Sequence, residues 1–433
     1  MSPVTQIHIA IVAAVLSALS ATAQNLSYGA ANFYRSDNVT IWPVTFNTLY
    51  QTEVAGNLFL PDNVDPSSTS NQSALVIGHP MGAVKEQSAN LYGTKMAEQG
   101  FVTLSLDLPH FGGSEGTPRQ AVSPDLYSES FSAAVDYLGT LSFVDRSRIG
   151  GIGICGSGSF LISAAKIDPR FAAVATASMY DMGTVNRQGL RNAQDVEQRK
   201  EIIAAAALQR WAQLDGAEPE WAIGTPLEIT NSSTVIDREF YDFYRTSRGE
   251  FTPAGGLPNT TTHRTLTTNT KFMNFYPFQD IDTISPRPLL IISGDQSHSR
   301  EFSETAYERA GEPKELIWVP GAGHTDLYDR VELIPFARLD EFFRSNLGAD
   351  YNEFGLEWSI RRAILLAGES GRRLHALYVK NIPLIGLKIV RKPALYIIDE
   401  LTFNIVSLIR IDGPQQSLSS HFIYPLDSNI RGR

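Results

Sequence analysis

One cysteine in the chain stands where a nucleophile would be exposed. Cys155 is the single cysteine of 433 residues, and it follows the apolar run 149–154 within the pentapeptide Gly-Ile-Cys-Gly-Ser at 153–157. Strand, sharp turn and a helix-compatible stretch at 159–166 form the pattern of a nucleophile elbow, with cysteine in the serine position of G-x-S-x-G. Ser157 replaces the last glycine of that motif. The alternative is a buried structural cysteine, which is the common role of a lone thiol.

Two further segments supply the partners that such a thiol needs. Asp295 follows the apolar strand pattern at 288–294, and His324 follows another at 315–320. A thiol is mostly protonated near neutral pH, so a histidine must accept its proton, and a carboxylate must orient that histidine. We therefore expect a Cys155–His324–Asp295 triad with a hydrogen bond from His324 to Asp295. Asp326 is the rival acid, but it lies on the same loop as the histidine.

Several longer segments carry a family resemblance. The chain resembles the dienelactone-hydrolase-like branch of the α/β-hydrolases, and especially the fungal polyketide transferases, over about residues 39–347. The matching segments are 79–87 (His-Pro-Met-Gly-Ala-Val-Lys-Glu-Gln), 153–158, 241–249, 284–290, 312–315 and 323–329 (Gly-His-Thr-Asp-Leu-Tyr-Asp). The resemblance implies an α/β-hydrolase fold, no cofactor, and ester, thioester or acyl-transfer activity on a small-molecule substrate. A polyketide-like or carrier-bound acyl group is the substrate class it suggests.

Acyl transfer also needs N–H donors for the oxyanion of the tetrahedral intermediate. We expect one from Gly156, directly after the nucleophile, and the second from Met81 in the loop after residues 77–78. His79 is assigned to substrate binding, with bracing of that loop as the alternative. Lys85 and Glu86 are expected to pair, either at the mouth of the site or as a solvated surface pair.

The order of apolar segments predicts the architecture. Residues 38–46 and 53–60 are expected to form an antiparallel pair, and short strands then alternate with helical stretches from 75 to 177. That alternation is typical of a mostly parallel, doubly wound sheet. The hydrolase domain is predicted over 38–347.

Residues 180–284 interrupt this alternation between the expected nucleophile and acid strands. A long helical stretch at 194–214, an aromatic segment at 238–245 and a loop rich in Gly, Pro and Thr at 251–269 suggest a helical cap insertion. Phe240 and Tyr244 are predicted to contact substrate. The wider set of cap aromatics either lines an apolar acyl pocket or forms the cap's own small core, and comprises Trp221, Phe240, Tyr241, Phe243, Tyr244, Phe272, Phe275 and Tyr276.

Both ends of the chain fall outside the predicted domain. Residues 1–23 combine an apolar stretch with Ala-Thr-Ala at 21–23, as in a secretory signal peptide, although the segment lacks Lys and Arg. Five glycosylation sequons agree with a secreted glycoprotein, at Asn25, Asn38, Asn71, Asn231 and Asn259. Residues 348–433 carry strand-like runs at 382–390 and 394–398. This tail is either an accessory domain or translated intron sequence, and we favour the second.

Composition and motifs exclude other classes of function. The net charge is −10 and no basic patch stands out, so nucleic acid is not expected as a partner. The eight histidines lack metal-site spacing, and neither apolar run in the tail is long enough to span a membrane. Residues 151–156 match G-x-G-x-x-G formally, but Asp168 precedes the next strand instead of ending it, which argues against a dinucleotide site.

We therefore predict an acyl hydrolase or acyltransferase that forms a covalent acyl-enzyme on Cys155. A dienelactone-hydrolase-like or general secreted esterase is the enzymatic alternative. A catalytically silent binding protein that keeps the hydrolase fold is the alternative of another class. The choice between hydrolysis and transfer, the exact acyl group and the oligomeric state stay open.

Overall fold

The computed structural model describes residues 34–69, 71–222 and 224–348, together with three short strands near the C-terminus. The chain divides into two compact units, 1–358 and 359–433. In the second unit the described strands are β11 (Lys388–Arg391), β12 (Ala394–Ile397) and β13 (Ile409–Ile411), which pair antiparallel. The predicted signal peptide and Asn25 lie outside the described residues, as does most of the tail.

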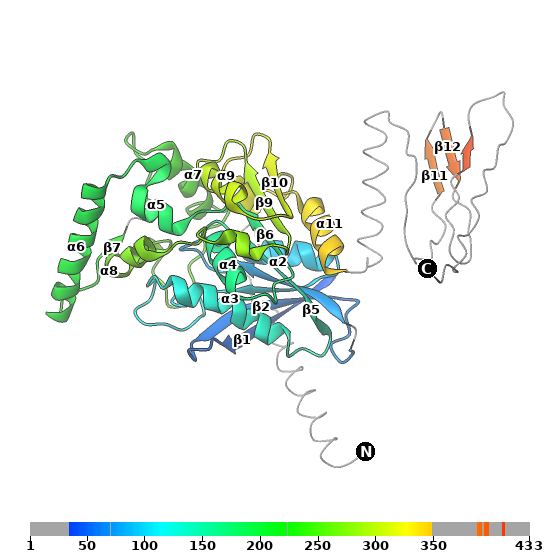
Figure 1. The fold of residues 1–433 in the computed structure, drawn as a ribbon, viewed down its shortest axis with the longest axis horizontal. Helices are drawn as coiled ribbons and strands as arrows, with labels where there is room; N and C mark the ends of the chain where they lie inside the picture. The colour runs from blue at the N-terminus through cyan, green and yellow to red at the C-terminus, as the bar shows by residue number, and fades with distance from the viewer. Residues whose placement is uncertain are drawn as a thin grey trace, which may run out of the picture. The chain divides into compact units, whose positions relative to one another are not determined.

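An eight-stranded sheet organises the first unit (Figure 1). Its order is β1-β2-β4-β3-β5-β6-β9-β10, where β1 and β2 are antiparallel to each other, β2 is antiparallel to β4, and all other pairs are parallel. The strands are β1 (Val39–Asn47), β2 (Glu53–Pro61), β3 (Gln72–Gly78), β4 (Val102–Leu106), β5 (Val144–Ile154), β6 (Ala173–Ala177), β9 (Leu289–Gly294) and β10 (Lys314–Val319). The predicted mostly parallel sheet is confirmed.

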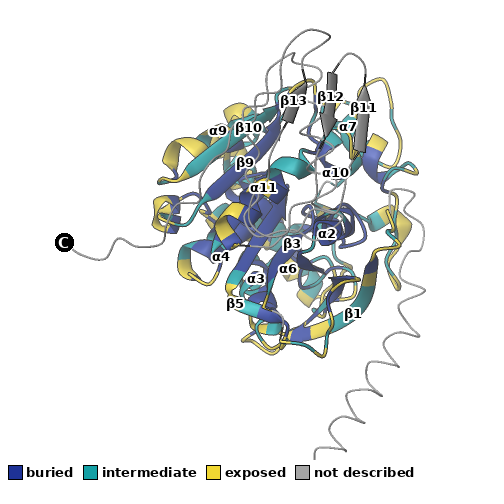
Figure 2. Cartoon of the chain, turned by 90° about the vertical axis from the view of Figure 1, so that its right-hand side faces the viewer, coloured by how far each residue is buried: buried dark blue, intermediate teal, exposed yellow. Residues whose placement is uncertain are grey.

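Helices cover both faces of this sheet. Successive residues of a strand point to opposite faces, and a Cβ added to Gly150 would lie 2.8 Å from Phe343 whereas one added to Gly151 would lie 2.8 Å from Leu161. Those two side chains belong to α11 (Phe336–Leu347) and α4 (Gly156–Ile167), which therefore pack on opposite faces. Helix α2 (Ala89–Glu98) contacts α11, and α3 (Pro124–Leu138) contacts α4. Figure 2 shows buried residues concentrated in the strands and in the inner sides of these helices.

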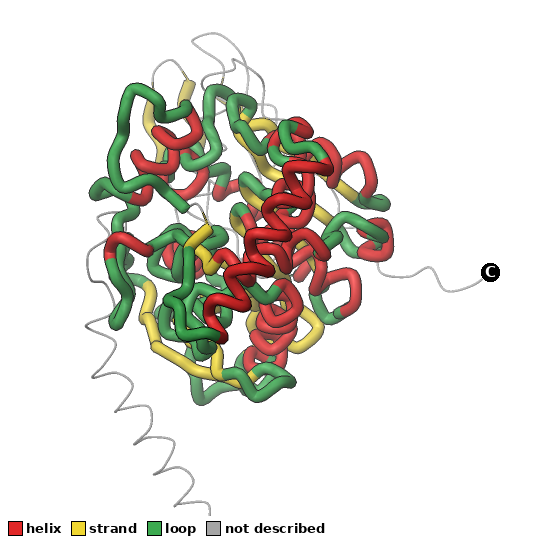
Figure 3. The backbone as a smooth tube through the Cα atoms, turned by 90° about the vertical axis from the view of Figure 1, so that its left-hand side faces the viewer, coloured by secondary structure: helices red, strands yellow, loops and turns green. Residues whose placement is uncertain are grey.

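The segment between β6 and β9, here called the cap, gathers at one side of the sheet in Figure 1. Its α-helices are α5 (Met182–Gln188), α6 (Val196–Leu214), α7 (Val235–Tyr244) and α8 (Leu266–Asn269), and β7 (Trp221–Ala222) pairs with β8 (Arg264–Thr265). Figure 3 views that side and shows α6 crossing it. The capping box between Asp195 and Gln198 explains why α6 begins where it does. The body resumes with α9 (Arg300–Arg309) and α10 (Asp326–Asp329).

Candidate active site

Cys155 occupies the turn between β5 and α4. Its backbone has φ 53° and ψ −118°, a conformation that a residue with a Cβ rarely adopts. The thiol is buried, and the backbone N–H groups of Gly156 and Met81 are in hydrogen-bonding contact with it. Strain of this kind is typical of functional positions. The structure thus brings Cys155 together with both expected oxyanion donors.

The loop that carries Met81 is packed tightly against the elbow. A Cβ on Gly156 would lie 2.5 Å from the Met81 Cβ, and one on Gly82, which has φ +85°, would lie 2.7 Å from the backbone oxygen of Thr262 in the cap. The Ser157 hydroxyl also donates to the carbonyl of His79. Nucleophile turn, oxyanion loop and cap therefore form one close-packed assembly.

His79 braces this loop. Its Nδ1 lies 2.8 Å from the Pro80 carbonyl oxygen, and its Nε2 accepts from the Leu108 N–H at 3.1 Å. Both ring nitrogens are used by backbone groups and the ring is fully buried. This geometry matches the bracing alternative and leaves neither ring nitrogen directed to a substrate.

A buried ion-pair cluster holds the same loop from the other side. Lys85 Nζ lies 2.9 Å from Glu86 and 2.7 Å from Asp107, and Asp107 also accepts from the Lys85 and Gly113 N–H groups. Although burial alone would lower the pKa of Lys85, the charges of Asp107 and Glu86 raise it. The Lys85–Glu86 pair was expected, but it is buried, and its link to Asp107 was not foreseen.

His324 lies on the loop after β10 and is fully buried. Its Nδ1 lies 2.7 Å from the Ser299 hydroxyl and 3.5 Å from that of Ser297. Its Nε2 lies 2.8 Å from the Tyr328 hydroxyl.

The structure does not place the expected acid, Asp295, against His324. The Asp295 carboxylate accepts from the Gly321 N–H at 2.8 Å and from the Gln296 side chain at 3.0 Å. Asp326 accepts from the Gly323 N–H and from Arg330. The Nδ1 position expected for Asp295 is taken by Ser299, because the chain turns after β9 so that residues 297 and 299 face the ring.

Tyr328 joins the thiol to the histidine. Its hydroxyl lies 2.8 Å from His324 Nε2, and through a hydrogen bond it opposes the rise that burial causes in the pKa of the Cys155 thiol. Because a neutral imidazole has one acceptor and one donor nitrogen, thiol, phenol and Nε2 can form a directed chain of hydrogen bonds. Sequence reasoning missed Tyr328, although its place four residues after His324 is a helical spacing that brings the two side chains together.

Burial keeps this chain uncharged at rest. It raises the pKa of Cys155 despite the opposing contacts with Tyr328, Gly156 and Met81. It also lowers the pKa of His324 well below its usual value, and the neighbouring His298 adds to that shift. A neutral thiol therefore faces a neutral imidazole, which can act as a general base.

Six of the cap aromatics fall into three groups. Phe240 and Tyr244 of α7 lie beside residues 320–329 after β10, here called the catalytic loop. The Phe240 ring lies 5.6 Å from His324, and the Tyr244 ring lies 6.2 Å from Tyr328. Their contact with substrate stays a prediction. Phe272 and Phe275 pack on Phe160 of α4, as a core would. Trp221 and Tyr276 are exposed.

A second histidine with a carboxylate stands beside His324. His298 Nδ1 lies 2.8 Å from Glu239 Oε2, and its Nε2 lies 2.7 Å from the Tyr180 hydroxyl. The His298 and His324 ring centroids are 4.7 Å apart. Sequence reasoning did not single out these residues, since Glu239 comes from the cap helix α7 and no local spacing links it to His298.

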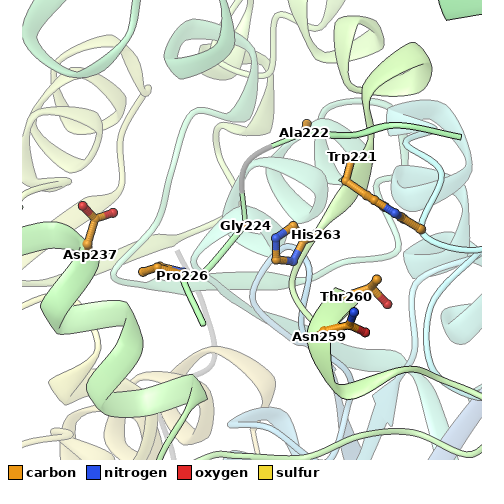
Figure 4. A pocket seen from close by; sticks show the side chains of 8 residues that line it. All are labelled: Trp221, Ala222, Gly224, Pro226, Asp237, Asn259, Thr260 and His263. Atoms are coloured by element: carbon orange, nitrogen blue, oxygen red, sulfur yellow. The ribbon is translucent and has the colours of Figure 1, made fainter. Parts of the chain in front are cut away.

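An open cleft of about 480 Å³ lies elsewhere, on the cap (Figure 4). Its lining residues all come from the cap, and Cys155 is not among them; they are Trp221, Ala222, Gly224, Pro226, Asp237, Asn259, Thr260 and His263. The chemistry described above is in the buried assembly around Cys155, so we do not place the active site in this cleft.

Within the described residues, no group of three or more His, Cys, Asp or Glu side chains could hold a metal ion. Nor does any helix in that part of the chain have the length and apolar character to cross a membrane. Four sequon asparagines are described, and all are exposed: Asn38, Asn71, Asn231 and Asn259. Their glycosylation stays a prediction.

Comparison with known proteins agrees with this geometry. Residues 75–334 match the model of the alpha/beta hydrolase family. The uncharacterized protein PA2218 of Pseudomonas aeruginosa is 44% identical over 305 residues, which is 70% of this chain and 80% of that protein. Its crystal structure has a TM-score of 0.68 at 42% identity, covering 73% of this chain and 96% of that one.

Relatives named for acyl chemistry are more distant. Polyketide transferase claH of Penicillium crustosum is 26% identical, covering 65% of this chain and 89% of that protein. Thiohydrolase aneE of Aspergillus aculeatus is also 26% identical, covering 67% of this chain and 89% of its own length. The resemblance to the fungal polyketide transferases is thereby confirmed. With an eight-stranded hydrolase sheet, a nucleophile turn and a family match over most of the described body, the chain belongs to the alpha/beta hydrolase family and is an enzyme of that type.

Proposed function

We propose that this enzyme transfers an acyl group from an ester or thioester to water or an alcohol through a covalent thioester on Cys155. The observation that carries the proposal is the position of the thiol, which contacts two backbone N–H donors and is linked through Tyr328 to His324 Nε2. A nucleophile, a base and an oxyanion site are the three parts that acyl transfer requires.

The order of events follows from these contacts. As the thiol attacks the carbonyl carbon, its proton moves to the Tyr328 oxygen while the Tyr328 proton moves to His324 Nε2. Gly156 and Met81 N–H groups bind the developing oxyanion. The proton on His324 then returns through Tyr328 to the leaving group, which departs as the acyl-enzyme forms. Ser299 accepts from Nδ1–H and so takes the orienting position that a carboxylate holds in the usual triad.

The acyl group is proposed to be apolar and polyketide-like. Relatives named as polyketide transferase and thiohydrolase support this substrate class, and the apolar rings of Phe240 and Phe243 beside the catalytic loop fit it. Activity should therefore rise from acetyl to longer p-nitrophenyl esters. If acetyl esters are the best substrates, a general small-ester hydrolase is the better account.

Trapping the intermediate tests the reaction type. The enzyme is mixed with an acyl N-acetylcysteamine thioester, quenched in acid and measured by intact mass. We expect one acyl adduct per chain on Cys155, none in Cys155→Ala, and a slowly turning over ester adduct in Cys155→Ser. Turnover by Cys155→Ala at the wild-type rate would refute the proposal, and a folded protein without any adduct or turnover would favour the silent binding protein.

A further inference from the structure

The Glu239–His298–Tyr180 chain has no part in the attack by Cys155 described above, yet it lies beside the same groups; Tyr180 is buried, whereas Glu239 and His298 are partly exposed. The Tyr180 N–H donates to the Cys155 carbonyl at 3.0 Å, and the Tyr180 ring centroid lies 5.0 Å from that of His324. Phe240 lies 5.4 Å from His298 on the cap side. The second histidine thus lies beside His324, under Phe240 of the cap.

The hydrogen bonds of this chain have one direction. An ionised carboxylate only accepts, so His298 Nδ1–H donates to Glu239 Oε2, and whenever the ring is neutral its Nε2 accepts from the Tyr180 hydroxyl. A carboxylate-oriented histidine whose other nitrogen faces a hydroxyl is the arrangement that removes a proton from an oxygen nucleophile.

Glu239 has a second role that couples the cap to the catalytic loop. Its Oε1 accepts from the backbone N–H groups of His324 and Thr325, the latter at 3.0 Å. One cap carboxylate therefore holds both histidines, His298 through the ring and His324 through the backbone.

We propose that Tyr180 deprotonates the water or alcohol that resolves the acyl-enzyme, with His298 and Glu239 as the positioning residues that make its hydroxyl a base. The inference rests on the proposed acyl-enzyme and assigns its two halves to different groups: Tyr328 and His324 serve acylation, and Tyr180, His298 and Glu239 serve deacylation. Two protonated rings at 4.7 Å would repel each other, which agrees with one histidine carrying a proton in each half.

The step balances as follows. The incoming O–H gives its proton to the Tyr180 oxygen while the Tyr180 proton moves to His298 Nε2. The incoming oxygen forms a bond to the acyl carbon, the C–S bond breaks, and its electron pair leaves on Cys155 Sγ. The proton held by His298 finally returns through Tyr180 to the thiolate. In the net change the acyl group moves from sulfur to oxygen and one proton moves from oxygen to sulfur.

Glu239→Gln is the most informative variant. The amide keeps the size of the side chain and an oxygen for the His324 and Thr325 N–H groups, but it presents an N–H to His298 Nδ1. The ring must then adopt the tautomer with Nε2–H, which cannot accept the Tyr180 proton. His298→Gln and Tyr180→Phe interrupt the same chain at its other members.

Asp237→Asn is the matched control, because Asp237 is a carboxylate on the same helix that only caps α7 through Thr234. The enzyme and each variant are mixed with the acyl N-acetylcysteamine thioester. The acylated fraction is followed by intact mass during turnover, and the rate of Cys155 alkylation by iodoacetamide is measured separately.

In Glu239→Gln we expect turnover to fall by about 10²- to 10⁴-fold, the usual contribution of a positioned acid–base group. The acylated fraction should rise toward completion, while alkylation stays within about threefold of the control, since general acid–base catalysis of deacylation does not enter the alkylation rate. An acylated fraction and turnover equal to the control would overturn the inference, as would an equal loss of alkylation and turnover, which indicates a purely structural role. If the wild-type enzyme acquires no adduct, the proposed acyl-enzyme itself fails and this inference with it.

Discussion

Replacing Tyr328 with Phe tests whether the phenol carries the proton between thiol and imidazole. The change removes the oxygen that lies 2.8 Å from His324 Nε2 and that opposes the burial-driven rise in the pKa of the Cys155 thiol. The ring contacts should remain, because Phe243 lies edge-on at 5.0 Å and His324 at 5.3 Å and neither depends on the hydroxyl.

Two magnitudes follow. A buried ring nitrogen left without its partner costs about 1–3 kcal/mol of stability, because His324 is fully buried. Loss of a positioned proton acceptor lowers the rate by about 10²- to 10⁴-fold, which corresponds to about 3–5 kcal/mol in the activation barrier. Acylation should therefore suffer far more than folding does.

Tyr92→Phe is a matched control for this change. The Tyr92 hydroxyl is buried and donates to the Leu327 carbonyl at 2.7 Å, on the same loop but away from the thiol. Both variants should lose similar stability in urea unfolding, whereas single-turnover acylation should fall in Tyr328→Phe alone. The proton path is refuted if the acylation rate of Tyr328→Phe stays within about threefold of the Tyr92→Phe rate. A positioned acid–base group contributes a far larger factor than that.

Three further predictions concern the groups around this path. Burial lowers the pKa of His324 below its value in the unfolded chain, so the unfolded state binds more protons in acid, and the free energy of unfolding should fall as pH drops below about 6.5. Urea titrations at several pH values should show a shallower fall in His324→Gln than in the wild type. Equal slopes in the two proteins would contradict this. Lys85→Met leaves Asp107 buried without its cation and should lower the free energy of unfolding in urea by about 3–5 kcal/mol. Lys200→Met, which breaks an exposed ion pair with Glu197, should lower it by less than about 1 kcal/mol. Equal losses would show that the buried cluster does not hold the loop. Gly82→Ala should lower turnover, because the φ of +85° and the 2.7 Å approach to the Thr262 backbone oxygen exclude a Cβ. Gly216→Ala, also at positive φ but with open space around it, should lose only stability. Unchanged turnover in Gly82→Ala would mean that the cap contact does not position Met81.

Local patterns in the sequence determined the body of the fold. Apolar runs of strand length alternate with helical stretches, and such runs need two covered faces, so a parallel doubly wound sheet was predictable. The elbow at Cys155 and the N–H donors of Gly156 and Met81 were predictable for the same reason. They depend on a turn directly after β5 and on the loop after the adjacent strand β3, whose ends meet at one edge of the sheet.

The partners of the histidine depended on contacts that no local pattern encodes. Asp295 ends its strand as expected, yet its carboxylate turns to the Gly321 N–H, because the loop after β9 directs Ser299 to the ring instead. The spacing of a strand end therefore placed the segment correctly without deciding which of its side chains faces His324.

What the sequence determined by itself is thus the sheet, the nucleophile turn and the positions of Cys155 and His324 after the ends of β5 and β10. Only the tertiary structure decided how those groups are connected. Tyr328 reaches the thiol because one helical turn folds it back over His324, and Glu239 reaches both histidines because α7 of the cap packs on the loop after β10. Hydrogen bonds between residues about 60 to 120 positions apart depend on packing of the whole chain, and a single sequence carries no periodic signal for them.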